Sequence, residues 1–370
     1  MNRIRAIWRV GWRVAVCALL LLWIFHNIFL SEGRYAAEQQ HQDWSRLARA
    51  EQWHLAWTIG PEALWVRLCL VHLPALVMSV LLVGLTVIGG VIRWQMVLRT
   101  QGLELGLGRA TGISMVAQFF NAFLLGSTGG DLIKAYYAAR ETHHKKTEAV
   151  TTVFVDRLIG LWAMLLFAVL MMIPNLSLLR QHRTLGALAL FTLSMLVALS
   201  GVLGVAFWGG VTRHWPRARP FLRRLPKGEM LERSLDSCRQ FGKERAFLVR
   251  AVLVSLALNV VWVFQVSVLA GGLGVQVPLI DFFVIVPIIF CVSALPITPS
   301  GLGVRENLFV LMLAVPEINV AKTAALSISL LSYASSLFWS VLGGLVYLGL
   351  RDKQHLAEVT HDTGAEDSSD

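Results

Sequence analysis

The chain has 370 residues and a formal net charge of +10, and 56% of its residues are hydrophobic while only 15% are charged. Soluble domains contain about 45–50% apolar and about 25% charged residues, so this composition excludes a water-soluble globular fold and a disordered chain. The basic residues flank apolar runs as long as a bilayer is thick. This placement indicates a membrane protein and argues against nucleic acid as a partner.

The first apolar run, Val14 to Leu30, follows a segment with four arginines and no acid. No small-residue cleavage site follows the run, so we interpret it as an uncleaved membrane span with a cytoplasmic N-terminus. Residues 31–65 hold five acids against three arginines, which suits an external interfacial loop. Trp53 and Trp57 lie one helical turn apart in this loop, which predicts a helix in the headgroup region.

Five further apolar segments are each about 20 residues or longer, enough to cross a hydrocarbon core of about 30 Å. They are 72–92, 151–173, 185–208, 251–270 and 323–349. The loop 209–250 contains eleven Lys or Arg and four acids, which predicts that it is cytoplasmic. Residues 1–350 therefore form the membrane domain, and the polar segment 351–370 is expected to be a disordered cytoplasmic tail.

Two apolar segments do not fit as single crossings. The first, Thr111 to Thr128, precedes a charged stretch, and a single crossing there would place the basic loop 209–250 outside. The second, 282–315, is interrupted by Pro296, Pro299, Gly301 and Gly303. We interpret both as re-entrant hairpins that enter from opposite faces, the alternative being plain kinks in ordinary helices.

This pattern predicts an all-α polytopic integral membrane protein with about six full spans and two re-entrant broken helical hairpins. Each half contains a span, a broken element at 111–140 or 282–315, and a second span, in opposite orientations. The arrangement is that of an inverted repeat. In such folds the broken helices meet near the midplane of the bilayer and form the substrate site.

The first break contains Asn121, Gly129, Gly130, Asp131 and Lys134. The glycines permit backbone conformations that are closed to other residues, and Asp131 is placed to cap the half-helix that follows. Lys134, one turn further, is a candidate partner for a phosphate or carboxylate. Capping and binding are compatible here.

The second break contains a flexible tip followed by a charged helix start; its candidate residues are Thr298, Pro299, Gly301, Gly303, Arg305 and Glu306. The planar fork of Arg305 suits phosphate. A charge at membrane depth costs about 2.5–3.5 kcal/mol on insertion scales, so it normally faces a polar interior and has a partner. The alternative is an Arg305–Glu306 pair that only fixes the hairpin.

Asp156 and Arg157 open the span 151–173. Two interpretations remain open for them. They form a structural ion pair that ties this span to the first hairpin, or Arg157 lines a pocket for lipid headgroups on the cytoplasmic side.

Three motifs together resemble the lysylphosphatidylglycerol synthase transmembrane-region family over about residues 70–345. The motifs are Asn121 with Gly129-Gly130-Asp131, Asp156-Arg157-Leu158-Ile159-Gly160, and Pro296-x-x-Pro299-x-Gly301-x-Gly303-x-x-Glu306. The resemblance implies an all-helical membrane domain that moves a polar lipid between leaflets. The residues after 350 are too few for a soluble synthase domain, so we expect a stand-alone membrane domain without aminoacyl transfer.

We expect a flippase-like lipid transporter of the cell inner membrane, with both termini cytoplasmic. Its substrate is expected to be an anionic phospholipid or a polyprenyl-phosphate-linked lipid. The four cysteines lack metal spacing and no nucleophile or zinc motif occurs, so we expect no enzyme, no cofactor and no metal. The alternatives are an intramembrane lipid-modifying transferase with Asp131, Asp156 or Glu306 as base, and a membrane partner of a cytoplasmic glycosyltransferase or another lipid-synthesis enzyme.

Overall fold

The computed structural model describes residues 19, 22, 23, 25–38, 44–123, 129–141, 145–176, 179, 183–207, 241, 242, 244–295 and 298–366. These residues form helices and connecting loops, and no strand occurs among them. Five of the described helices are long and apolar enough to cross a membrane. They are α3 (Leu73–Thr100), α6 (Lys146–Met172), α8 (Arg183–Phe207), α12 (Arg245–Gly272) and α15 (Lys322–Glu366).

The predicted all-α polytopic membrane fold is confirmed, and the five helices coincide with five of the six predicted spans. Of the sixth predicted span, Val14 to Leu30, the structure describes only residues 19, 22, 23 and 25–30, and these are helical. Most of the basic loop 209–250 also lies outside them. The last helix, α15, continues to Glu366, where the sequence predicts a disordered tail, because the residues after 350 include several strong helix formers.

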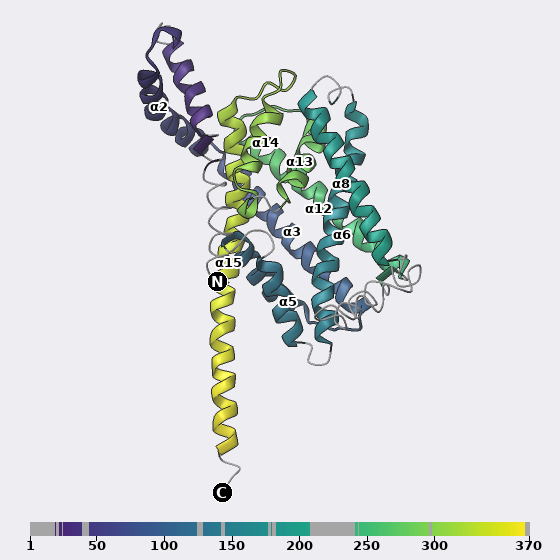
Figure 1. The fold of residues 1–370 in the computed structure, drawn as a ribbon. Coiled ribbons are helices and arrows are strands. Elements are labelled where there is room, and N and C mark those ends of the chain that lie inside the picture. Colours follow the sequence, from purple (N-terminus) through teal and green to yellow (C-terminus); the bar gives the residue numbers. More distant parts are fainter. Residues whose placement is uncertain are drawn as a thin grey trace, which may run out of the picture.

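The helix at 25–38 and α2 (Arg49–Cys69) form a pair that projects from one end of the bundle beside α15 (Figure 1). Trp53 and Trp57 lie on α2 and are exposed, so the predicted helix in this segment is confirmed. The Thr323 hydroxyl of α15 donates a hydrogen bond of 2.9 Å to the Glu32 carboxylate. This contact joins the projecting pair to the rest of the protein.

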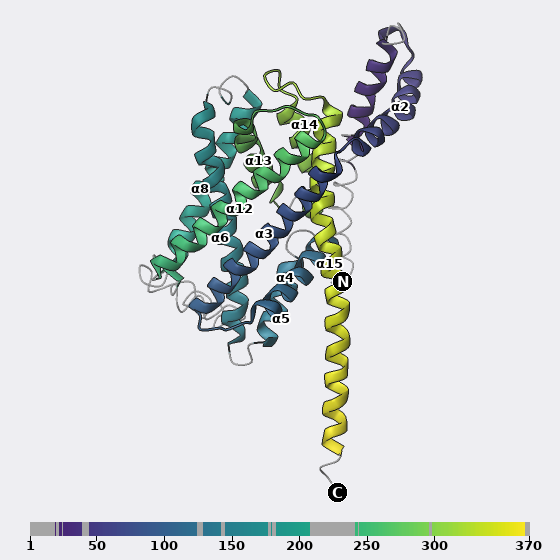
Figure 2. The ribbon, with the colours of Figure 1, turned by 180° about the vertical axis from the view of Figure 1, so that it is seen from behind.

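Two broken elements interrupt the long helices. The first comprises α4 (Leu107–Phe123) and α5 (Gly129–Glu141), and the second comprises α13 (Leu279–Ser293), the 3-10 turn η3 (Pro299–Gly301) and α14 (Val304–Leu313). The longest of these helices has 17 residues, short of the ~20 that a full crossing needs. In Figures 1 and 2 the first element lies toward one end of the bundle and the second toward the other.

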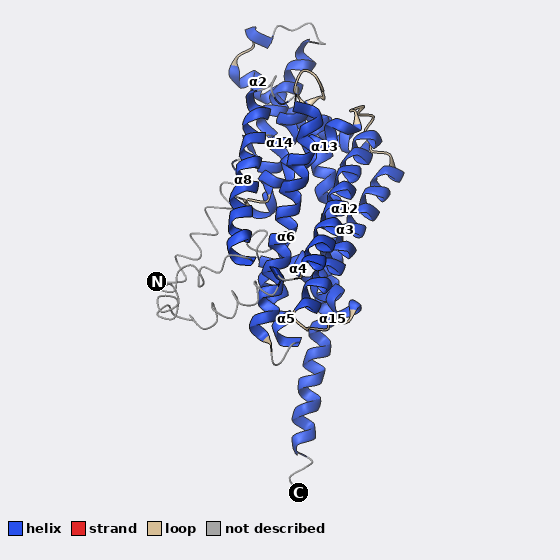
Figure 3. Ribbon diagram, turned by 90° about the vertical axis from the view of Figure 1, so that its right-hand side faces the viewer, coloured by secondary structure: helices blue, strands red, loops and turns tan. Residues whose placement is uncertain are grey.

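The two broken elements touch at their tips. The Ser300 hydroxyl, in η3, donates a hydrogen bond of 2.8 Å to the backbone oxygen of Asn121 at the end of α4. Ser300, Gly301 and Gly303 have φ values of 53°, 70° and 84°, a left-handed run that turns the chain sharply into α14. Figure 3 shows the same opposed placement of α4 and α13 from the side.

The helices α3 and α12 are neighbours that run in opposite directions. The backbone N–H of His72, before α3, bonds to the Gly272 oxygen at the end of α12 at 3.0 Å. Both helices have 28 residues, and the interval from Leu73 to Leu107 equals that from Arg245 to Leu279. The first helices of the two halves therefore match in length, and a broken element follows each of them at the same interval.

A buried polar cluster joins α3, α12 and α15, and we call it the neutral hub: Ser79, Gln265, Ser332 and Ser335. The Gln265 amide donates to the Ser79 hydroxyl at 2.7 Å and accepts from the Ser332 hydroxyl at 3.1 Å. The Ser79 and Ser335 hydroxyls lie 2.8 Å apart. All four residues are buried, so their hydrogen bonds hold the three helices in register at membrane depth.

Candidate functional site

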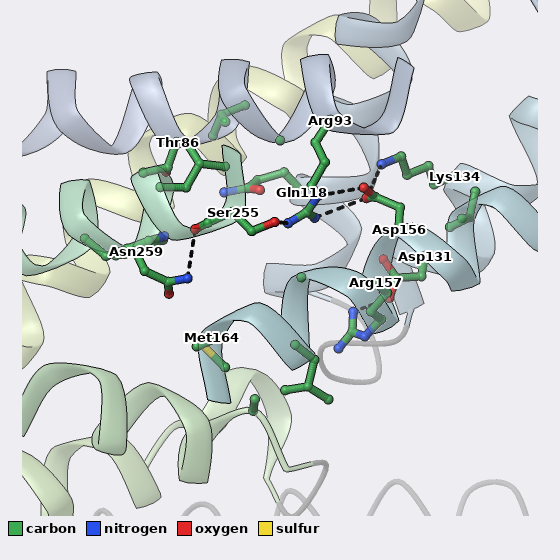
Figure 4. A pocket seen from close by; sticks show the side chains of 18 residues that line it. Thr86, Arg93, Gln118, Asp131, Lys134, Asp156, Arg157, Met164, Ser255 and Asn259 are labelled. Carbon is green, nitrogen blue, oxygen red and sulfur yellow. Dashed lines mark hydrogen bonds and ion pairs between the residues drawn. The ribbon is translucent and has the colours of Figure 1, made fainter. Parts of the chain in front are cut away.

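A cavity of about 590 Å³ lies among α3, α4, α5, α6 and α12, and its lining also includes Ala294 directly after α13. Both broken elements therefore contribute to its wall. Figure 4 shows its side chains, with charged residues gathered on one side. We call this side the charged wall: Arg93, Asp131, Lys134, Asp156 and Arg157.

Asp156 is the centre of the charged wall. Its Oδ1 lies 2.8 Å from Arg93 Nε and its Oδ2 lies 3.3 Å from Arg93 Nη2, a bidentate pair, and Lys134 Nζ lies 3.7 Å from Oδ2 (Figure 4). The Asp156 side chain is only 8% exposed. Removing either the carboxylate or its cations would leave a buried charge without a partner, which strongly destabilises a folded protein.

Arg93 was missed as a site residue. It follows the predicted span 72–92 directly, where a basic residue suggests a helix end, but α3 continues to Thr100 and brings Arg93 into the bundle. Its Nη1 donates to the Ser255 hydroxyl of α12 at 3.0 Å. A Cβ on Gly160 would lie 2.7 Å from Nη1, so the glycine of the Asp156 motif leaves room for this guanidinium.

Asp131 forms an ion pair with Arg157. Since α5 begins at Gly129, Asp131 lies in its first turn rather than at its cap, and the Asn121 side chain accepts the Gly130 N–H instead, at 2.8 Å. A Cβ on Gly130 would overlap the Ala117 backbone oxygen, which explains the glycine there. The half-buried Gly129 starts the helix.

Lys134 is fixed by two contacts. Its Nζ lies 4.1 Å from the ring centroid of Trp94, in a cation–π contact, and it pairs with Asp156. Two ion pairs therefore connect α5 to α6: Lys134 with Asp156, and Asp131 with Arg157. Asp156 and Arg157 thus each tie α6 to the first broken element, and Arg157 also lines the cavity.

Arg305 and Glu306 lie outside the cavity lining. Their side chains are 8% and 0% exposed and pair with each other. Arg305 Nε also donates to the Ser329 hydroxyl at 3.2 Å, and Glu306 accepts the Gly303 N–H at 2.6 Å. This geometry matches the interpretation in which the pair fixes the second hairpin.

The remaining candidates of the second break shape its tip. Gly301 packs closely, since a Cβ there would lie 2.9 Å from the Ser293 backbone oxygen. Pro299 begins η3. The hydroxyls of Thr298 and Ser293 are buried and have no hydrogen-bond partner within the described part of the chain.

Uncharged polar side chains also line the cavity, and we call three of them the neutral wall: Thr86, Gln118 and Asn259. Thr86 donates to the Val83 oxygen at 2.7 Å and Asn259 donates to the Ser255 oxygen at 2.8 Å. The sequence offered no signal for these residues, because they converge only when α3, α4 and α12 pack together. The cavity thus has a charged and a neutral side.

The model of the lysylphosphatidylglycerol synthase TM region matches residues 47–344. The chain belongs to this family. The matched range includes all three sequence motifs, both broken elements and every described residue that lines the cavity. No protein with a curated description matches the chain.

Membership in this family and the apolar helices identify an integral, multi-pass membrane protein of lipid metabolism or transport. Such a protein contacts membrane lipids along its helices. Its charged wall offers ion-paired guanidinium and ammonium groups next to carboxylates, an arrangement suited to the charged head of a lipid.

Proposed function

We propose that the protein is a flippase-like transporter that carries a phosphate-bearing lipid headgroup between the two leaflets. A headgroup that crosses hydrocarbon unaided loses the water around its charge, which is the main barrier to spontaneous movement. The observation that carries the proposal is the cavity, in which three cations and several polar side chains lie within a membrane-spanning bundle. These groups replace the lost water.

The paired halves support a transport mechanism. In inverted-repeat transporters, broken helices from the two halves meet at a central site, and the halves rock against each other to alternate access. Here the helices of the two halves match in order, and the Ser300–Asn121 contact joins the two tips. We infer that the broken elements are re-entrant hairpins of an inverted repeat.

We propose that the protein lies in the cell inner membrane. In the proposed orientation both termini and the basic loop 209–250 face the cytoplasm. A cysteine placed at Lys145, between α5 and α6, tests this orientation. A membrane-impermeant thiol reagent added outside intact cells should leave it unlabelled. Labelling from outside would contradict the re-entrant first hairpin.

An enzymatic role is less well supported by the geometry. Asp131, Asp156 and Glu306, the candidate bases of a transferase, each form an ion pair with a basic side chain. An adjacent cation favours the ionised form of a carboxylate and so makes it a weaker base. We therefore propose that the chain transports lipid without altering it covalently.

The test is headgroup movement in liposomes that contain the purified protein and a trace of fluorescent phosphatidylglycerol. Dithionite, which stays outside, bleaches the outer leaflet at once and the inner-leaflet label only as it emerges. Arg157→Gln should slow emergence about tenfold or more, equivalent to at least ~1.4 kcal/mol. The matched control is Arg99→Gln, an exposed arginine of α3 that is not in the cavity lining. Equal rates for wild type and Arg157→Gln would contradict this site.

A further inference from the structure

The geometry points to a particular class of substrate: a phosphodiester headgroup with hydroxyl groups and no amine, such as a glycerol or sugar phosphate. This inference rests on the proposed function and deepens it. It follows from the balance of charge in the cavity and from the chemistry of the neutral wall.

The cavity carries an excess of one positive charge. Among the described residues that line it, three are basic (Arg93, Lys134 and Arg157) and two are acidic (Asp131 and Asp156). The acids already pair with these cations. A phosphodiester brings one negative charge and neutralises the cavity when it binds.

A zwitterionic headgroup fits this balance less well. Its ammonium group adds a positive charge beside three others and leaves the excess in place, and charge without a partner is costly at membrane depth. Proteins that recognise ammonium ligands often use cages of several aromatic rings. Trp262 is the only aromatic residue among the described lining residues, so no such cage is built.

The neutral wall matches hydroxyl groups. The Gln118 amide has no hydrogen bond within the described part of the chain, and the amide of Asn259 uses only its Nδ2, leaving its oxygen available. An amide both donates and accepts, as a hydroxyl does, so a glycerol or sugar can satisfy both groups. An ammonium only donates and would leave the Gln118 N–H groups unmatched.

Two kinds of lipid that carry this chemistry are tested here: glycerophospholipids with a glycerol head, and prenyl phosphates linked to a sugar. Both are monoanionic phosphodiesters with hydroxyl groups. A binding experiment with soluble short-chain analogues covers both sources and separates them.

The experiment measures thermal stabilisation of the purified full-length protein in detergent by three ligands. These are dihexanoyl-phosphatidylglycerol, a short-chain prenyl phosphoglucose and dihexanoyl-phosphatidylethanolamine. We expect at least one of the first two to bind about tenfold more tightly than the ethanolamine lipid. Whichever of these two ligands binds more tightly identifies the kind of lipid that the protein recognises. Equal affinity for all three, or preference for ethanolamine, would overturn the inference.

Variants of the neutral wall test the hydroxyl contacts. Gln118→Leu and Asn259→Leu should each weaken binding of the preferred ligand about 3- to 10-fold, the usual effect of losing one or two hydrogen bonds. Neither should change binding of the ethanolamine lipid. The matched control, Asn175→Leu, replaces an amide outside the cavity and should change neither. An unchanged affinity in both cavity variants would overturn the role of the neutral wall.

The liposome assay separates this inference from the proposed function. Selective binding without lipid movement would contradict transport but support the substrate class. Movement of phosphatidylglycerol and phosphatidylethanolamine at equal rates, without selective binding, would support transport but contradict the substrate class.

Discussion

The two broken elements share one architecture but differ in where their charges point. In the first element, Asp131 and Lys134 reach outward to α6 and line the cavity. In the second, Arg305 and Glu306 pair with each other, and Ser329 hydrogen-bonds Arg305 beside them. One element therefore contributes its charges to the cavity, and the other uses its charges to hold its own turn.

The long helices repeat this contrast. The charged cluster of Arg93, Asp156 and Ser255 joins α3, α6 and α12, while the neutral hub around Gln265 joins α12, α3 and α15. Each cluster connects the first helix of one half to the last helix of that half and to the first helix of the other half. The first half therefore supplies most of the residues that line the cavity, and the neutral hub ties both halves together.

The largest expected effect comes from Asp156→Asn. Removing this carboxylate leaves Arg93 and Lys134 buried without their acid, which should destabilise the protein by about 3–5 kcal/mol and abolish transport. Thermal unfolding in detergent and the liposome assay measure the two effects. The control is Ser332→Ala in the neutral hub, which should cost only about 0.6–1.7 kcal/mol and leave transport intact. Similar losses in both variants would contradict the contrast between the two clusters.

Glu306→Gln tests whether the second element is scaffold. Arg305 then lies buried without its acid, so the free energy of unfolding should fall by about 3–5 kcal/mol. A lower melting temperature in detergent would report this loss. The transport rate per folded molecule should stay within about twofold of wild type. Losing ~1.4 kcal/mol of interaction in the site would instead lower that rate about tenfold. A tenfold loss of transport in fully folded Glu306→Gln protein would instead indicate that Arg305 and Glu306 lie on the substrate path.

Gly160→Ala should have a smaller effect. The added methyl lies 2.7 Å from Arg93 Nη1 and forces the guanidinium away from Ser255. We expect a several-fold loss of transport and a loss of stability of about 1–3 kcal/mol, typical of overpacking. Gly271→Ala, at a position of α12 where a Cβ meets open space, is the matched control and should leave transport unchanged. Wild-type transport in Gly160→Ala would show that the Arg93 position does not matter.

The sequence predicted the helices well because each apolar run is long and carries strong charge markers. A tie between α6 and the first broken element was one of the two interpretations that the sequence left open for Asp156 and Arg157, and the ion pairs agree with it, because charges at membrane depth require partners. The sequence missed Arg93, whose position next to the end of an apolar run indicates a boundary. A signal was present in Gly160, because a glycine beside a buried acid leaves space for a large side chain.

The neutral wall could not be predicted from the sequence, and for Arg305 the sequence left two roles open, a phosphate ligand or a pair with Glu306 that fixes the hairpin. Gln118 and Asn259 are more than a hundred residues apart in the chain and converge only through packing of α4 and α12 against α3. Arg305 has the chemistry of a phosphate ligand, but it is buried, lies outside the cavity lining and donates to the adjacent Glu306 and the distant Ser329. Only the folded arrangement distinguishes a charge that faces a cavity from one that closes a turn.

Filling the cavity tests its role as the lipid path most directly. Gly90 lines the cavity, and a Cβ there meets no atom within 4 Å, so Gly90→Trp should block the space without disturbing the ion pairs. Gly201→Trp, which also meets open space but on α8 outside the cavity, is the control. We expect both variants to fold and only Gly90→Trp to lose transport of phosphatidylglycerol in liposomes. Transport at the wild-type rate in a folded Gly90→Trp protein would contradict this path.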